Sequence, residues 1–274
     1  MASLAISVVT FNTSEDVFAQ TLSSISESVS TYKKVRGVKE VALRIVNNAD
    51  EKLCSLYNPV VFETATEFVD DFRVIEGHGN IGYGSAHNLA LAEMDAEFYL
   101  IMNPDVIIQR DAIRVGVDFL NTVDNVIALN PFCEDQYGNR QYLCKTYPSV
   151  LGLLLRAIPK KIGEQFLAGL QSRYEMRDIS GESPTTGVPL LSGCFILAKR
   201  EHLKAVGGFN PDYFLYFEDF DLSLRLGLMG DLAYLPQMKI VHRGGNASKK
   251  GIWHISMFVR SSFRFFQNHG WRWY

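Results

Sequence analysis

An adjacent pair of acids, Glu218 and Asp219, is the part of this sequence best suited to acid–base chemistry. The pair stands in the first turn of a predicted helix, where the helix dipole favours negative charge. Aromatic residues flank it on both sides: Tyr213, Phe214, Tyr216, Phe217 and Phe220. Burial among aromatic rings raises the pKa of a carboxyl group, so that it can act as a general base near neutral pH. Helix capping would explain one of these acids, but it does not easily explain two.

A third acid, Asp221, completes a literal Asp-x-Asp pattern with Asp219. It also stands four residues before Arg225, the spacing at which acid and base pair along a helix. We therefore interpret Asp221 as a structural partner of Arg225 and look for metal ligands elsewhere.

Asp105 and His242 are the residues whose types and positions suit a divalent metal ion. Asp105 ends the motif NPD, and the proline before it stops a predicted strand, which presents the aspartate at the sheet rim. His242 ends a β-branched run and precedes a glycine pair. Carboxylate, imidazole and phosphate together suit Mg²⁺ or Mn²⁺. A strand-ending turn at Asp105 and a purely structural His242 are the simpler alternatives.

The stretch GHGNIGYGSAHN, from Gly77 to Asn88, contains a literal G-x-G-x-x-G. Strand, loop and helix are all predicted around it, and an acid, Asp105, lies about 20 residues downstream, as in dinucleotide-binding folds. However, the loop follows the third predicted strand, whereas the fingerprint usually follows the first. Glycines also allow backbone amides to approach any phosphate or sugar. A dinucleotide-dependent oxidoreductase is therefore an alternative that rests on this loop alone.

The first half of the chain alternates strands and helices, which predicts a parallel sheet. The strands are predicted at residues 4–10, 41–46, 72–76 and 97–102, and the polar runs TFN, NNAD, GHGN and NPD follow them. Because ligands bind at the carboxyl ends of such strands, we expect the four runs to meet at one edge.

The second half indicates a smaller antiparallel part. A hairpin is predicted to turn at Tyr137–Asn139, a strand to run over residues 188–200, and two short strands, LAYLP and KIVH, to precede the end of the domain. The predicted fold class is α/β, with a mostly parallel central sheet flanked by helices and a smaller antiparallel part.

Composition limits the classes of partner. The 274-residue chain has a net charge of −3, which gives no reason to expect nucleic acid binding. Four cysteines show no metal-ligand spacing, so we expect reduced core thiols and an intracellular location: Cys54, Cys133, Cys144 and Cys194. The N-terminus lacks the pattern of a signal peptide, and no run reaches the roughly 18 apolar residues that a membrane-spanning helix needs.

Taken together, the motifs resemble those of the family 2 glycosyltransferases of GT-A fold, most closely the bacterial rhamnosyltransferase-like branch of cell-surface polysaccharide synthesis. The resemblance covers nearly the whole chain, from Ile6 to Asn268, and lies in ordered stretches: ISVVTFN, VNNAD, GNIGYGSAHN, NPD, LSGCFILAKREHLKAVGGFNPDYFLYFEDFDLSLR and VHRGG. The chain departs from the family where Asn47 and Asn103 stand in place of usual aspartates.

The resemblance implies an inverting, metal-dependent transferase that moves a sugar from a nucleotide-sugar donor to a hydroxyl of a saccharide acceptor, which in this branch is lipid-linked. dTDP-rhamnose is the favoured donor and UDP-galactofuranose an alternative. Asp219 would be the base and Glu218 the second choice or an orienting partner, with Mg²⁺ or Mn²⁺ held by Asp105 and His242. A catalytically silent sugar-binding homologue is a further alternative, suggested only by Asn47 and Asn103.

The same resemblance implies substrate contacts at matching positions. Base and ribose would meet Thr10, Asn12, Asn47 and Asn48. The donor would be lined by Asn80, Gly82 and Asn88. Asn103 would either bind the metal through a water molecule or contact the sugar. The acceptor side would be formed by Ser192, Gly193 and Cys194.

We predict a glycosyltransferase domain over residues 1–246 and a helical tail over residues 247–274. The tail mixes basic and aromatic residues, a composition that suits an anionic membrane surface as well as packing on the domain. The expected location is cytoplasmic, with peripheral contact at the inner face of the cell membrane.

Overall fold

The computed structural model describes residues 2–37, 40–156, 164–244 and 251–274. Its strands are β1 Ala2–Thr10, β2 Val41–Asn47, β3 Asp71–Ile75, β4 Ala96–Met102, β5 Val106–Ile108, β6 Val126–Glu134, β7 Arg140–Gln141, β8 Thr185–Thr186, β9 Phe195–Lys199 and β10 Asp231–His242. Its helices are α1 Glu15–Arg36, α2 Leu53–Leu56, α3 Val60–Thr66, α4 Tyr83–Glu93, α5 Ala112–Thr122, α6 Val150–Arg156, α7 Glu164–Tyr174, α8 Arg200–Ala205, α9 Glu218–Leu226 and α10 Ile252–His269.

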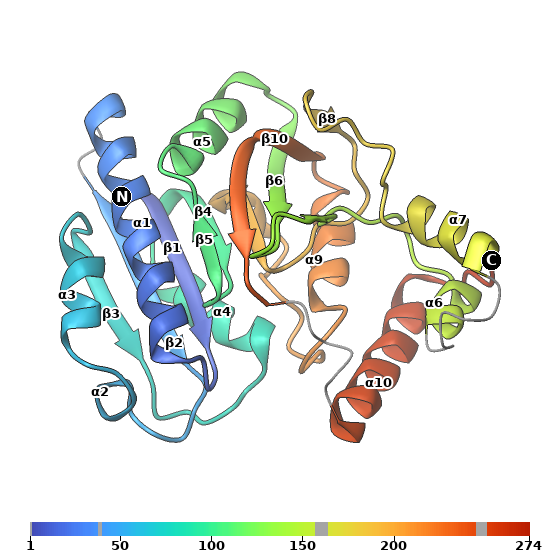
Figure 1. The fold of residues 1–274 in the computed structure, drawn as a ribbon, viewed down its shortest axis with the longest axis horizontal. Coiled ribbons are helices and arrows are strands. Elements are labelled where there is room, and N and C mark those ends of the chain that lie inside the picture. The colour runs from blue at the N-terminus through green and yellow to red at the C-terminus, as the bar shows by residue number, and fades with distance from the viewer. Residues whose placement is uncertain (1, 38–39, 157–163, 245–250) are drawn as a thin grey trace.

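The described strands form one sheet in the order β3-β2-β1-β4-β9-β6-β10-β5, with β7 beside β6 and β8 beside β10 (Figure 1). The strands β3, β2, β1 and β4 are parallel. Strand β9 then runs antiparallel between β4 and β6, while β6 and β10 are parallel to each other. The predicted α/β class, with a parallel part and an antiparallel part, is confirmed.

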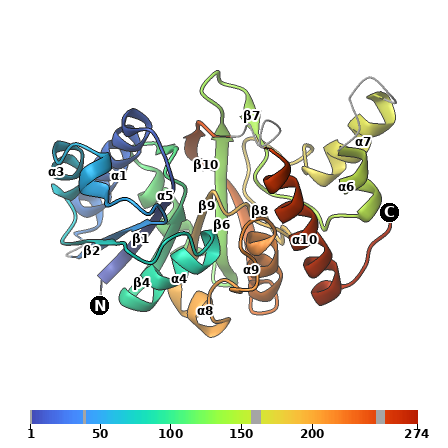
Figure 2. The same ribbon diagram turned by 90° about the horizontal axis from the view of Figure 1, so that it is seen from below.

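The side chains of β1 alternate between the two faces of the sheet, and both sets are buried. Leu4, Ile6 and Val8 belong to a core cluster on one face of the sheet, and Ala5 and Val9 to a second cluster on the other. Successive residues of a strand point to opposite faces, so both faces of β1 must be covered. Helices α1 and α5 cover the first face, and α4, α8 and α9 cover the second (Figures 1 and 2).

Two predicted elements of the second half differ from the structure. Of the strand predicted over residues 188–200, only β9 is regular, because the N–H groups of Ser192 and Gly193 donate to side chains of Asn130 and Asp219 instead of to a neighbouring strand. The two short strands predicted before His242 are the single strand β10, whose register shifts within the stretch that contains the donor-less residue Pro236.

The predicted C-terminal helix is α10, and its residues Phe265 and Phe266 form a third apolar cluster with Tyr213 and Phe217. The division into domains at residue 246 stays a prediction. Within the described residues, no helix is both long and apolar enough to cross a membrane. Cys54 is exposed on the short helix α2, so the expectation of four core thiols is wrong for this residue.

Candidate active site

Asn48 links the carboxyl ends of β1 and β2 to each other and to the residue before α4 through two hydrogen bonds. The Asn48 N–H donates to the Thr10 carbonyl at 2.9 Å, and the Asn48 side-chain amide donates to the Gly82 carbonyl at 3.1 Å. Three positions predicted to contact the donor therefore lie together at the carboxyl edge of the sheet, where parallel α/β folds bind ligands.

Gly82 lies in the glycine loop at a position with no room for a side chain. Its φ is +88°, and a Cβ on it would overlap the Phe214 carbonyl oxygen, which accepts the Tyr83 N–H at 3.1 Å. Asn80 holds the turn, because its side-chain oxygen accepts the Gly82 N–H at 3.1 Å. The loop thus allows two backbone segments of the chain to approach closely, and an approach of its amides to a phosphate or sugar stays a prediction.

Three other asparagines predicted to face the donor have clear local surroundings. Asn47 accepts the Ala49 N–H and donates to the Glu51 carbonyl, which fixes the turn after β2. Asn88 both donates to the Phe209 carbonyl and accepts its N–H, so its amide is fully engaged with backbone. Asn12 is exposed and has a φ of +55°, a conformation that asparagine tolerates. Donor contact by all three stays a prediction.

The acid pair starts α9 on a strained backbone. Tyr216 and Phe217, directly before Glu218, have φ values of +71° and +65°, which bulky residues rarely adopt. Such a conformation costs about 1–3 kcal/mol per residue and persists only where surrounding contacts enforce it. The contacts that enforce this one come from α10: the Tyr216 hydroxyl bonds His254 Nδ1 at 3.0 Å, and the Phe217 ring packs on two phenylalanines of the helix.

Asp219 is held by two backbone donors. Its Oδ2 accepts the Gly193 N–H at 2.8 Å and its Oδ1 accepts the Phe220 N–H at 2.9 Å. Burial nevertheless raises the pKa of Asp219 to about 6. Burial and the Asp219 charge raise the pKa of Glu218 to about 8, and Glu218 Oε2 has no hydrogen-bond partner among the described residues. Both pKa shifts have the predicted upward direction. Asp219 receives two backbone N–H groups, whereas Glu218 Oε2 receives none from the described residues, so Asp219 is the member of the pair that ionises more readily.

Asp221 has the structural role predicted for it. Arg225 Nε donates to Asp221 Oδ2 at 2.8 Å, and His269 Nε2, from the end of α10, lies 2.8 Å from Asp221 Oδ1. Both carboxylate oxygens of Asp221 therefore bond to side chains of the fold. The literal Asp-x-Asp motif of Asp219 and Asp221 thus offers no second carboxylate for a metal ion.

The three residues predicted on the acceptor side connect the acid pair to the end of β4. Gly193 donates its N–H to Asp219 and accepts the Tyr83 hydroxyl at its carbonyl, at 2.7 Å. The carbonyl of the next residue, Cys194, accepts the Asn103 N–H at 2.9 Å. The Tyr83 hydroxyl has its pKa raised by burial first, and also by the charges of Asp219 and Asp105 among others.

Asp105 and His242 face each other across 3.3 Å between Oδ1 and Nε2. Asn103 Nδ2 lies 3.5 Å from the same His242 Nε2. Gly244 closes over the pair, because a Cβ there would overlap Asp105 Oδ2 and come within 2.9 Å of His242 Nε2. NPD and the histidine segment, far apart in sequence, therefore form one local arrangement, as the antiparallel pairing of β5 with β10 requires.

Gln141 sets the orientation of His242. Gln141 Nε2 lies 3.2 Å from the His242 carbonyl, which can only accept, so the amide nitrogen must face it. Gln141 Oε1 then faces His242 Nδ1 at 3.1 Å and accepts its hydrogen. With Nδ1 protonated in the neutral ring, His242 Nε2 turns its lone pair toward Asp105, an arrangement that a cation between them would stabilise.

The residues present fit a divalent metal ion that takes further ligands from a substrate. Asp105 Oδ1 is buried and accepts no hydrogen bond from the described residues. No group of three His, Cys, Asp or Glu side chains suitable for a metal occurs within that part of the chain. Magnesium-type sites commonly use one or two protein ligands and complete their shell with phosphate oxygens and water.

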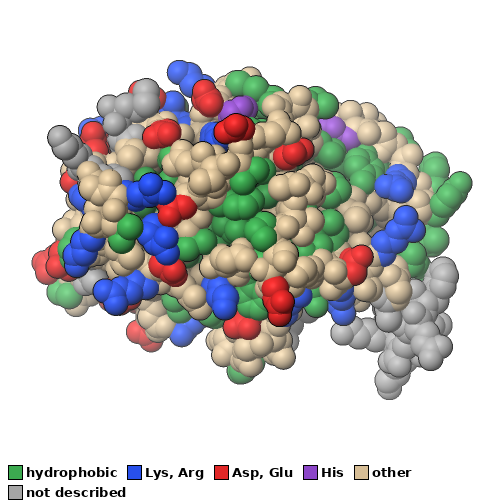
Figure 3. Space-filling view, turned by 90° about the horizontal axis from the view of Figure 1, so that it is seen from above, with side chains coloured by type: hydrophobic (Ala, Val, Ile, Leu, Met, Phe, Trp, Pro, Cys, Tyr) green, Lys and Arg blue, Asp and Glu red, His purple; other side chains and the backbone are tan. Residues whose placement is uncertain are grey.

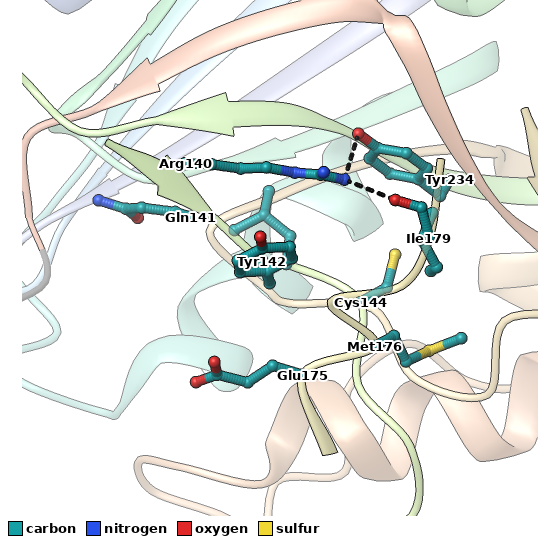
Figure 4. Close-up of a pocket in the computed structure, with 9 residues that line it drawn as sticks. Arg140, Gln141, Tyr142, Cys144, Glu175, Met176, Ile179 and Tyr234 are labelled. Atoms are coloured by element: carbon teal, nitrogen blue, oxygen red, sulfur yellow. Dashed lines mark hydrogen bonds between the residues drawn. The ribbon is translucent and has the colours of Figure 1, made fainter. Parts of the chain in front are cut away.

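A small pocket borders this site on the far side of β7 (Figure 4). Arg140 lies in it and donates to the Tyr234 hydroxyl and the Ile179 carbonyl, each at 3.2 Å. Its guanidinium carbon stands 4.7 Å from the centre of the Tyr142 ring. Figure 4 shows Gln141 pointing away from Arg140, as alternation along a strand requires. These contacts of Arg140 hold β7, the short strand that also carries Gln141, in place.

Sequence reasoning missed Tyr83, Asn130 and Gln141. Tyr83 lies within the glycine-loop motif, whose aromatic position was a usable signal. Asn130 is fully buried, and its side chain bonds both the Ser192 N–H and the Phe195 carbonyl. Gln141 stands in a predicted hairpin and carries no motif, so its contact with His242 could not be foreseen.

No protein-family model matches the chain. It is 27% identical over 224 residues to the N-acetylglucosaminyl-diphospho-decaprenol L-rhamnosyltransferase of Mycobacterium tuberculosis, covering 76% of this chain and 72% of that protein. It is 25% identical over 202 residues to the rhamnosyltransferase WbbL of Escherichia coli, covering 68% and 70%. The fold is similar to that of GalNAc-T7 crystallised with UDP, GalNAc and Mn²⁺, with a TM-score of 0.63 and 13% identity, covering 89% of this chain but only 43% of that one.

Proposed function

We propose, starting from the premise that this chain is a rhamnosyltransferase-like glycosyltransferase of GT-A fold, that it transfers L-rhamnose from dTDP-rhamnose to a hydroxyl of a lipid-linked saccharide. One observation carries the proposal. An unbroken series of contacts runs from Asp219 through Gly193, Cys194 and Asn103 to His242 and Asp105. The proposed base, Asp219, is thus linked by a few direct contacts to the pair, Asp105 and His242, that would carry charge beside the donor phosphates.

The proposed reaction is a single displacement with inversion. The acceptor oxygen bonds to the anomeric carbon as the bond from that carbon to the nucleoside diphosphate breaks. Asp219 takes the proton of the attacking hydroxyl, a role for which its raised pKa suits it. Glu218 stays protonated beside it, which avoids two adjacent negative charges near the acceptor.

Asp105 and His242 would hold Mg²⁺ or Mn²⁺. The ion would supply positive charge that neutralises the leaving diphosphate. The lone pair that Gln141 directs from His242 Nε2 and the unpartnered Asp105 Oδ1 support this assignment. The GalNAc-T7 structure, which has a similar fold, contains Mn²⁺ with UDP.

The remaining substrate contacts follow from position. Thr10, Asn48 and Gly82 meet at the edge where the nucleoside would bind. The acceptor would approach over Gly193, next to the base. The name of the mycobacterial relative specifies a decaprenol-linked acceptor. A similar acceptor would place this enzyme in the cytoplasm, at the inner face of the membrane.

A donor screen tests the proposed function. We expect dTDP-rhamnose with Mn²⁺ or Mg²⁺ to raise the melting temperature of the chain, and to do so less when EDTA is present, because binding to the folded state stabilises it. UDP- and GDP-sugars provide the comparison, followed by a transfer assay with a lipid-diphosphate acceptor. Stabilisation by NAD(H), without any by nucleotide sugars, would contradict the proposal and favour the oxidoreductase alternative.

Replacement of Gln141 by Leu should weaken metal binding. The substitution removes the acceptor for the Nδ1 hydrogen of His242, and loss of such an outer partner typically lowers metal affinity about 10–100-fold. Mn²⁺ titration followed by electron paramagnetic resonance measures this directly, without turnover. Gln237→Leu is the matched control, since Gln237 is exposed on the same strand as His242 and its side chain donates to the Glu182 carbonyl, away from His242. Equal Mn²⁺ affinity in both variants would show that Gln141 does not position a ligand.

A further inference from the structure

Helix α10 carries two apolar stripes, one buried and one exposed, roughly 130° apart around its axis. One face packs into the fold through Phe258, Ser261 and Phe265. The other carries apolar residues at spacings of three and four, and all of them are exposed: Ile252, Ile255, Val259 and Phe263. A surface helix of a globular protein usually has one apolar stripe, which faces the core. Within the described residues no element covers this second stripe, which makes it a candidate interaction surface.

The exposed stripe continues past the end of α10 onto α6. The Trp271 ring contacts Phe263 with centroids 5.4 Å apart and stacks on Trp273 at 5.6 Å. The carbonyls of Arg272 and Trp273 accept the N–H groups at the start of α6. We call the whole area the α6–α10 surface and define it by Leu154, Ile255, Val259, Phe263, Trp271 and Trp273, each of them exposed.

The described segment that contains α10 and the C-terminal tryptophans is basic. Residues 251–274 contain three arginines, Arg260, Arg264 and Arg272, and none of the 30 Asp and Glu residues of the chain, although the whole chain has a net charge of −3. Arg260 is exposed beside the apolar stripe, whereas Arg264 pairs with Asp212. Figure 3 views the molecule from above, the side opposite to the view of Figure 2 in which α10 lies in front, and shows acidic and basic side chains intermingled over its left half.

We propose that the α6–α10 surface binds an anionic lipid bilayer, with α10 lying parallel to the membrane plane. Exposed aliphatic residues on one helix face, basic residues beside them and tryptophans at the end are the features that bind helices to membrane interfaces. Positive charge adds attraction to anionic headgroups. An aliphatic stripe with these tryptophans and without acidic residues fits a bilayer better than a polar protein partner.

The surface adjoins the acceptor side of the active site. Ser261 of α10 donates to the Leu215 carbonyl at 2.8 Å, and His254 bonds the Tyr216 hydroxyl, three residues before Asp219. A bilayer against the exposed face of α10 would thus hold a lipid-linked acceptor near Asp219. This use of the surface rests on the proposed function, whereas bilayer binding itself rests on the exposed residues and charges.

Intrinsic fluorescence tests the proposal without a label, because the three tryptophans of the chain, Trp253, Trp271 and Trp273, all belong to the tail. The full chain is titrated with vesicles of phosphatidylcholine mixed with phosphatidylglycerol, and separately with phosphatidylcholine alone. We expect a blue shift of the emission with the anionic vesicles, and quenching when brominated phosphatidylcholine is included. Unchanged emission with anionic vesicles would overturn the proposal.

Paired variants identify the surface. The double variant Ile255→Asp, Val259→Asp places two acids on residues that are 61% and 59% exposed, and should lower affinity for anionic vesicles by about tenfold or more, since each charge opposes the surface potential. Leu228→Asp is the control, because Leu228 is 88% exposed and lies outside the α6–α10 surface. Both variants should keep the melting temperature of the parent chain.

Three outcomes separate the remaining possibilities. Equal vesicle affinity of the double variant and the control would overturn the assignment of the surface. A dimer of the parent chain that the double variant loses in light scattering, without vesicle binding, would assign the surface to a second copy instead. Vesicle binding without sugar transfer by any donor would leave the membrane surface standing and remove the proposed function, so the two failures are distinguishable.

Discussion

Replacement of Asp219 by Asn is expected to lower the transfer rate by about 10²–10⁴-fold, the usual contribution of a general base. Asn is nearly isosteric with Asp and can still accept one of the two backbone N–H groups that hold the side chain, from Gly193 or Phe220. Donor binding should therefore persist while turnover is lost. Transfer kinetics, together with a donor titration by calorimetry, measure the two effects separately.

Glu218→Gln is the matched control for this prediction. Glu218 is the group with the higher pKa, so it is already protonated where Asp219 ionises, and Gln imitates its neutral form. In the parent chain kcat/KM should fall as the pH drops through about 6, because protonated Asp219 cannot accept the acceptor proton. That acid limb should remain in Glu218→Gln. If Glu218→Gln instead causes the larger loss of rate, the roles of the two acids are reversed.

Replacement of Asp105 by Ala should remove most of the metal-dependent donor affinity, and His242→Ala should do the same to a smaller degree. Stabilisation of a leaving diphosphate by a metal ion amounts to several kcal/mol, which corresponds to about a thousandfold in rate. Donor titration by calorimetry, with Mn²⁺ and with EDTA, reports the effect on binding. Transfer kinetics then report the effect on the chemical step.

Asp111→Asn provides the control for the metal-site variants. Asp111 lies just beyond β5 and pairs at the surface with Arg114, so it tests the loss of an acid near Asp105 without touching the site. Its donor affinity should match that of the parent chain. If Asp105→Ala retains the full difference between Mn²⁺ and EDTA, these two residues do not hold the metal.

Local sequence patterns were sufficient to predict the parallel half of the sheet. Strands such as β1 are short apolar runs with polar residues at their ends, and burial on both faces follows from that composition. The strand predicted over residues 188–200 was wrong beyond β9 because of long-range contacts: the backbone at Ser192 and Gly193 bonds Asn130 and Asp219. Sequence spacing does not report such contacts.

Residues of the candidate site that would act on a substrate or metal could be predicted from the sequence. Residues that only orient another side chain could not. The meeting of Asp105 and His242 followed from the family resemblance, and the structure brings them within 3.3 Å. Gln141 was not predictable, because its role depends on the register between β6 and β7 and on the carbonyl of His242. Asn88 was predicted to line the donor, yet its amide is engaged by Phe209, a partner 121 residues away.

The left-handed backbone at Tyr216 and Phe217 links the free energy of α10 docking to the position of the acid pair that follows. Contacts from α10 balance the conformational cost that holds Glu218 and Asp219 at the start of α9. Thermodynamic reciprocity then applies: if a ligand that orders the loop before α9 changes the affinity of α10 for a membrane, membrane binding changes the affinity for that ligand by the same factor. A lipid surface acting on α10 would thus serve as an allosteric effector of sugar transfer as well as an anchor.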